Sequence, residues 1–124
     1  MIERIIDNHI EIAVILRANF SFDGIKFLND RNDSLQLGYM KRQKGHEIRP
    51  HSHKVIKRII ERTMEVLYIK SGKIEINFYN DKQIYLTKKI LTKGDTVILI
   101  RGGHGILMLE ESEIIEIKQG PYLD

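Results

Sequence analysis

The sequence contains no cysteine and no tryptophan, and only two of its 124 residues are proline. The lack of cysteine excludes disulfide bonds, thiolate metal ligands and a cysteine nucleophile, and it fits a reducing compartment. Aromatic residues are few, at 7%, and the net charge is only +3. No run of aromatic residues interleaved with Lys and Arg offers a stacking platform for bases, so we expect no binding to nucleic acid.

Long hydrophobic runs are also missing. No apolar stretch approaches the roughly 18 residues of a membrane-spanning helix, and residues 1–7 lack the pattern of a signal peptide. The content of 42% hydrophobic and 30% charged residues is typical of a globular protein, and the length suits a single domain covering residues 1–124. We therefore expect a cytoplasmic domain that makes no contact with a membrane.

Many short apolar runs, separated by turn residues, are present instead. Residues 73–79 alternate apolar and polar, as in a half-buried strand, whereas residues 10–20 and 96–100 are apolar on both faces. No long stretch has the helical period. The pattern predicts an all-β protein of roughly ten short strands, arranged as a barrel or jelly-roll sandwich, with its N-terminal strands in residues 1–40.

Residues 45–53, GHEIRPHSH, carry the clearest chemical signal. On an extended strand, His51 and His53 would project from one face, about 6.6 Å apart along the chain, and could bind one metal ion. Glu65 and His104 are candidates for the third and fourth ligands. Three imidazoles and one carboxylate suit a divalent transition metal (Fe, Mn, Ni, Co, Cu or Zn) better than Ca or Mg.

The spacing of these residues resembles the two motifs of the cupins, small jelly-roll (double-stranded β-helix) proteins, over about residues 45–106. The positions that carry the resemblance are Gly45, His51, His53, Glu65 and Gly72 in the first motif, and Gly94, Asp95, Gly102 and His104 in the second. The resemblance implies a single cupin domain with a metal site of His51, His53, Glu65 and His104. The glycines beside His104 permit a sharp turn that directs its imidazole inward.

The chain departs from the cupin pattern in several places. Eleven residues separate His53 from Glu65, where the family usually has three or four, and Glu61 lies closer to the histidines. Residues 54–64 could form a short helix or a strand-like lid, because the periodicity of so short a segment cannot distinguish them. The second motif is one residue shorter than the pattern, with Ile100 in place of Pro and Met108 in place of Asn.

Basic residues in and before this insertion suggest an anionic ligand. Arg49 and Arg58 could give the metal site a positive rim, and Tyr39 is a further candidate contact to the substrate. The alternative is that the charges are solvated on an exposed loop, whose apolar residues pack on the barrel or on a second subunit.

Three functions fit these observations. The first is a metal-dependent enzyme of the cupin type, an oxygenase or isomerase acting on a small molecule. The second is a cupin that binds a ligand without catalysis. The third is a metal-free sugar isomerase or epimerase that uses histidine as acid and base. A weaker similarity to uncharacterised cupins of surface-polysaccharide pathways favours a sugar substrate. The family resemblance also implies a homodimer, with residues 10–16 as the candidate interface.

Overall fold

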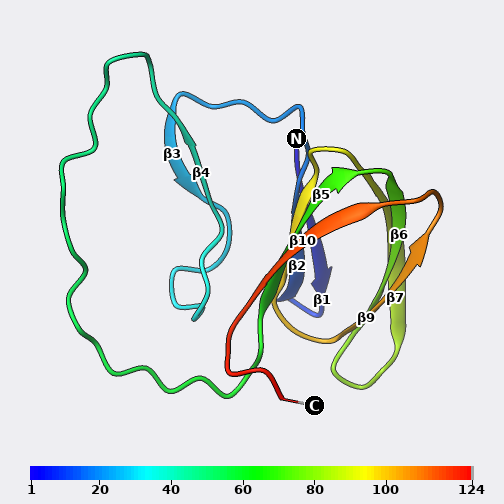
Figure 1. Ribbon diagram of the computed structural model, residues 1–124. Coiled ribbons are helices and arrows are strands. Elements are labelled where there is room, and N and C mark those ends of the chain that lie inside the picture. Colours follow the sequence, from blue (N-terminus) through cyan, green and yellow to red (C-terminus); the bar gives the residue numbers. More distant parts are fainter. Residues whose placement is uncertain (124) are drawn as a thin grey trace.

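The protein, described here by a computed structural model over residues 1–123, consists of ten β-strands joined by turns and loops (Figure 1). The strands are β1 (Ile2–Asp7), β2 (Ile10–Leu16), β3 (Gly24–Phe27), β4 (Gly38–Lys41), β5 (Glu65–Ser71), β6 (Lys73–Tyr79), β7 (Tyr85–Thr92), β8 (Thr96–Leu99), β9 (Gly103–Met108) and β10 (Glu113–Lys118). No helix occurs in residues 1–123, so that part of the chain contains none that could cross a membrane. The predicted all-β class is confirmed.

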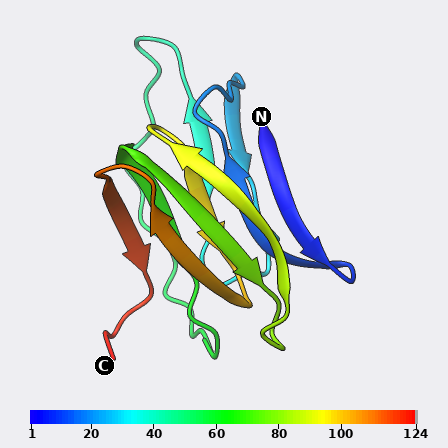
Figure 2. The ribbon, with the colours of Figure 1, turned by 90° about the vertical axis from the view of Figure 1, so that its right-hand side faces the viewer.

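The strands form three antiparallel sheets. A five-stranded sheet has the order β1-β2-β8-β5-β10, and a three-stranded sheet has the order β7-β6-β9. Figure 2 shows the three strands of the smaller sheet side by side. Strands β3 and β4 pair only with each other, as a hairpin that lies beside the larger sheet. The two larger sheets make a β-sandwich.

The main core lies between these two sheets. Strand β6 places Ile74, Ile76 and Phe78 in it, each fully buried, while the alternate residues of the strand stay partly exposed. The predicted half-buried strand is therefore confirmed, because successive side chains of a strand point to opposite faces. The larger sheet contributes Ile15 and Leu67, among others, to the same cluster.

The larger sheet is buried on its outer face as well. Val14, Val66 and Ile98 point away from the main core and form a second cluster with Leu28 and Met64. The loop between β3 and β4 adds partly buried leucines to this cluster. This second layer explains why β2 and β8 have apolar residues at consecutive positions, as the sequence indicated.

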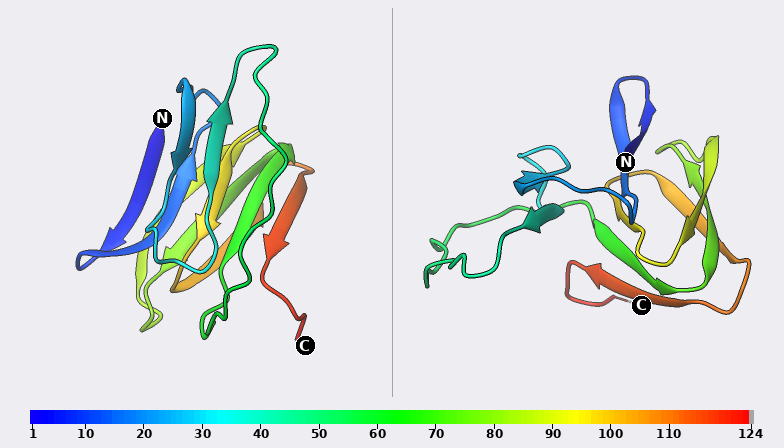
Figure 3. Two further views of the ribbon diagram at one scale, coloured as in Figure 1. Left: turned by 90° about the vertical axis from the view of Figure 1, so that its left-hand side faces the viewer. Right: turned by 90° about the horizontal axis from the view of Figure 1, so that it is seen from above.

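The structure differs from the sequence expectations between β4 and β5. Residues 42–64 contain no strand and no helix, so the predicted histidine strand is absent, and residues 54–64 form neither a helix nor a strand-like lid. Every residue from 42 to 63 is exposed. Figure 1 and the view from above in Figure 3 show this segment extending away from the sandwich. We call residues 42–63 the arm.

Candidate functional site

Glu65 and His104 come together at one end of the sandwich. Glu65 is the first residue of β5 in the larger sheet, and His104 lies on β9 in the smaller sheet. The Nε2 atom of His104 is 2.7 Å from the Oε1 atom of Glu65, and the two side chains are 32% and 14% exposed. Two candidate ligands from separate sequence motifs thus meet in the folded chain.

A pocket of about 260 Å³ surrounds this pair. Its other lining residues are Thr63, Leu99, Arg101, Gly102 and Lys118. The Nε atom of Arg101 is buried and has no hydrogen-bond partner, although a buried polar group of this kind is normally paired. Arg101 and Lys118 give the pocket a cationic lining, which favours a ligand with negative charge.

The ionisation of the pair reflects its partial burial. The pKa of Glu65 is raised from its ordinary 4.5 to about 7, mainly by burial and also by a hydrogen bond with Glu116, while Lys118 opposes the shift. Burial also lowers the pKa of the His104 imidazole, against the attraction of Glu116. The pKa of Glu116 is lowered, first by its hydrogen bond with Glu65. Close to neutral pH, Glu65 can therefore hold or release a proton beside a neutral imidazole.

The other two predicted ligands, His51 and His53, lie on the arm. Both are exposed, and their ring centroids are 5.3 Å apart. Nδ1 of His51 donates a hydrogen bond of 2.8 Å to the carbonyl oxygen of Arg49. This bond leaves the lone pair on Nε2 free, which is how metal-binding histidines are commonly oriented. The two imidazoles thus stay together as predicted, but on an exposed segment instead of a strand of the sandwich.

No three side chains of His, Cys, Asp or Glu within residues 1–123 converge closely enough to hold a metal ion. The predicted set of four is divided into a pair in the pocket, Glu65 and His104, and a pair on the arm. Glu61, the alternative acidic candidate, is exposed on the arm.

The predicted substrate contacts lie outside the pocket lining. Arg49 and Arg58 are exposed on the arm. Tyr39 lies on β4, where its ring makes an edge-to-face contact with Phe20 at a centroid distance of 4.9 Å. The cationic lining predicted for the site comes instead from Arg101 and Lys118.

Sequence reasoning did not identify Arg101, Glu116 or Lys118. Glu116 and Lys118 occupy alternate positions of β10, which pairs with β5 and sets Lys118 opposite Glu65. Their alternation was visible in the sequence and indicates a shared face of the strand. The sequence could not show which strand lies next to β10, because these strands are far apart along the chain.

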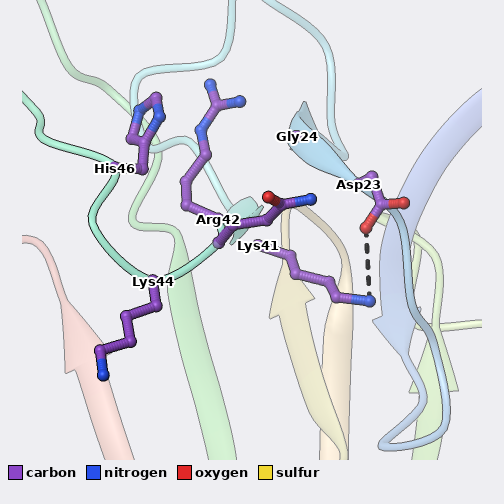
Figure 4. Close-up of a pocket in the computed structure, with 7 residues that line it drawn as sticks. Asp23, Gly24, Lys41, Arg42, Lys44 and His46 are labelled. Carbon is purple, nitrogen blue, oxygen red and sulfur yellow. Dashed lines mark ion pairs between the residues drawn. The ribbon is translucent and has the colours of Figure 1, made fainter.

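A second, larger hollow of about 560 Å³ lies at the base of the arm, where β3 begins and β4 ends (Figure 4). Lys41, Arg42, Lys44 and His46 line it together with Asp23, which pairs with Lys41 at 3.3 Å. These five side chains are all exposed, and Lys44 points away from the others in Figure 4. Water screens charges in such a setting, so we regard the smaller pocket at Glu65 and His104 as the candidate site.

Comparison with protein-family models, curated proteins and solved structures finds no match to this chain. The geometry of the pocket and of the arm is therefore the basis for assigning a function.

Proposed function

We propose that this protein is a metal-binding β-sandwich of the cupin type that acts on a small anionic molecule, with a divalent transition metal held by Glu65, His104, His51 and His53. The contact between Glu65 and His104 carries the proposal. Ligand atoms about 2.1 Å from one ion, at right angles to each other, lie about 3 Å apart. The observed 2.7 Å between Oε1 and Nε2 is close to that spacing.

The topology supports the jelly-roll part of the proposal. Strands far apart in the sequence are neighbours in the sheets, as in β2 with β8, β5 with β10, and β6 with β9. Such long-range antiparallel pairings between two facing sheets are typical of jelly rolls. The pocket then lies where residues from the two sheets meet.

The residues of the pocket have separable roles in this proposal. A bound transition metal would polarise a carbonyl or activate oxygen. Arg101 and Lys118 would bind the negative charge of the substrate and orient it. Glu116, through its hydrogen bond, holds the Glu65 carboxyl in place. Carboxylates and sugar derivatives that carry negative charge match this lining.

The first test is the metal content of protein purified without an affinity tag or chelator, measured by plasma mass spectrometry. We expect about one transition-metal ion per chain, lost almost completely in Glu65→Gln and in His104→Gln, because each removes a ligand and metal ligands act together. His46→Ala is the matched control, since His46 is exposed and outside the pocket. Wild-type protein that stays free of metal after supplementation would refute the metal proposal.

A second candidate function is metal-free acid and base catalysis by Glu65 and His104. The observation in its favour is that the two side chains share a hydrogen-bonding contact inside a pocket lined by cations. A carboxyl and an imidazole in this arrangement can pass a proton to and from a substrate at neutral pH. Ligand turnover by protein that contains no metal would favour this candidate over the first.

The raised pKa of Glu65 predicts a pH-dependent stability in metal-free protein. Between about pH 4.5 and pH 7 the folded state keeps a proton that the unfolded state releases, so this group lowers the stability as pH rises. Glu65→Gln lacks this effect. We expect the difference in melting temperature, variant minus wild type, to increase by several degrees between pH 5 and pH 8. This increase is equivalent to about 1–3 kcal/mol in the free energy of unfolding.

The measurement is thermal unfolding followed by circular dichroism, with EDTA present at both pH values. Glu61→Gln is the control, because Glu61 is exposed on the arm. A difference between Glu65→Gln and wild type that stays constant or shrinks toward pH 8 would contradict the prediction.

A further inference from the structure

The arm is unusual in its exposure. Val55, Ile56, Ile59 and Ile60 are 104%, 60%, 81% and 47% exposed, although the chain has enough length here to fold back on itself. Extended residues advance about 3.3 Å each, so 22 residues can reach far beyond the surface of one domain. Apolar side chains exposed in a row mark a segment that binds another surface.

The sandwich offers a surface that matches the arm. Strand β9 pairs with β6 on one side only, and no strand of residues 1–123 pairs with its other edge. Ile106, Leu107 and Met108 of β9 are 38%, 54% and 51% exposed. An open edge with apolar side chains accepts an additional strand through backbone hydrogen bonds, and β-branched residues such as those of the arm favour this pairing.

Charge adds a second form of complementarity. The arm carries seven Lys and Arg residues against two Glu residues. The turn that follows β9 is acidic, with Glu110 and Glu111 in the turn and Glu113 at the start of β10, all of them exposed. A basic, apolar segment is thus matched to an apolar strand edge with an acidic border, which favours this pairing over others and speeds association.

The direction of the arm indicates which molecule it binds. In Figure 1 the arm lies on one side of the five-stranded sheet, and β9 lies on the other side with β6 and β7. The view from above in Figure 3 shows the same separation. Apart from its last residues, where Arg62 pairs with Asp81 at 3.3 Å, the arm of one chain therefore projects away from its own β9 edge.

We propose that two copies of this chain exchange arms, so that the arm of each copy lies along the free edge of β9 in the other. The reciprocal contact closes a symmetric dimer, as in domain swapping. Because His104 is on β9, the exchange brings the exposed pair His51 and His53 to the Glu65–His104 pocket of the second copy. This last part rests on the proposed metal site, whereas the exchange of arms does not.

This interface differs from the one expected at residues 10–16. Strand β2 has β1 on one side and β8 on the other, so its backbone groups are already paired within the chain. Ala13, Val14 and Ile15 of this strand are fully buried. Most of its apolar residues thus belong to the core of one copy, although Ile10 is 42% exposed.

The first experiment measures the molar mass by sedimentation and light scattering. We expect about 29 kDa for wild type, twice the 14.5 kDa of the chain, and a shift to the monomer mass for the double variant Val55→Asp/Ile59→Asp. Both side chains are exposed in one copy, so the sandwich should stay folded, and the far-ultraviolet circular dichroism should lose only the strand contribution of the exchanged arms. Ile84→Asp, at another exposed apolar position, is the control and should remain dimeric. A monomeric wild type, or a dimeric arm variant, would overturn the exchange.

The second experiment tests whether the metal site is shared. The variants His51→Ala/His53→Ala and Glu65→Gln/His104→Gln should each lack metal alone. Co-expressed, they form mixed dimers with one intact site, so the mixture should regain about a quarter of the wild-type metal content. A mixture without metal, beside a wild type that binds it, would show that each copy builds its own site and would overturn this part. A wild type without metal would refute the proposed function, and the molar masses would still decide the exchange.

Discussion

Replacing Gly102 with alanine is expected to destabilise the protein by about 3 kcal/mol or more, lowering the melting temperature by roughly 10 °C. Gly102 has a φ of +75°, which costs other residues about 1–2 kcal/mol. A Cβ atom there would also overlap the carbonyl oxygen of Tyr79, a backbone atom that cannot move alone. Relief of the overlap would shift the turn before β9, and with it His104, so the variant should also bind much less metal.

Gly105→Ala is the matched control for this prediction. Gly105 lies on β9 directly after His104, and a Cβ atom there would meet nothing within 4 Å. Thermal unfolding and metal content should both stay close to wild type in this variant. If Gly102→Ala behaved like Gly105→Ala, the close approach of Gly102 to Tyr79 would not exist in solution.

Replacing Asp95 with alanine should also cost about 3 kcal/mol or more in the free energy of unfolding. Asp95 is buried, and its carboxylate accepts hydrogen bonds of 2.8 Å from the backbone nitrogens of Ala18 and Thr92, and one of 3.2 Å from Nη1 of Arg17. It thereby joins the chain after β2, the end of β7 and the start of β8. Alanine would leave two backbone donors and part of a guanidinium group without this acceptor at a partly buried position.

Urea unfolding followed by circular dichroism measures this loss directly. Asp23→Ala is the control, because Asp23 forms an exposed ion pair with Lys41 at 3.3 Å. Pairs of this kind contribute about 0–1 kcal/mol. A loss in Asp95→Ala no greater than in Asp23→Ala would mean that the carboxylate does not link these three segments.

Comparing Asp95→Ala with Gly102→Ala distinguishes a loss of overall stability from a local change in the pocket. Asp95 is outside the pocket lining and should affect metal binding only through global stability, whereas Gly102 is part of the lining. At a temperature where both variants remain folded, only Gly102→Ala should bind metal weakly. This difference tests whether the turn before β9 positions His104.

The sequence was sufficient to predict the all-β class and most of the strands. Residues 73–79 alternate apolar and polar because one face of that strand is buried, and residues 96–100 are continuously apolar because both faces are buried. Such patterns can be seen within a short stretch of sequence. Gly102 was also predictable as a turn residue, because positive φ is a property of one residue and its neighbours. One strand of the structure, β1, gave no clear signal in residues 2–7.

The site was predictable only in part. Glu65 and His104 were selected from motif spacing, and the structure brings them into contact. The structure places His51 and His53 on the arm, because a strand requires a neighbouring strand to pair with and none in residues 1–123 pairs with this segment. A sequence shows that a segment favours the extended form, and the partner strand depends on the whole topology.

The residues of this chain thus determined by themselves the all-β class, most of the strands and the positions of several turns. These properties depend on residue type and on spacing along the chain. Only the tertiary structure decided that Arg101, Glu116 and Lys118 gather around Glu65 and His104, and that residues 42–63 project away from the sandwich. Contacts between residues distant in sequence depend on sheet order, and sheet order is set by the packing of all ten strands together.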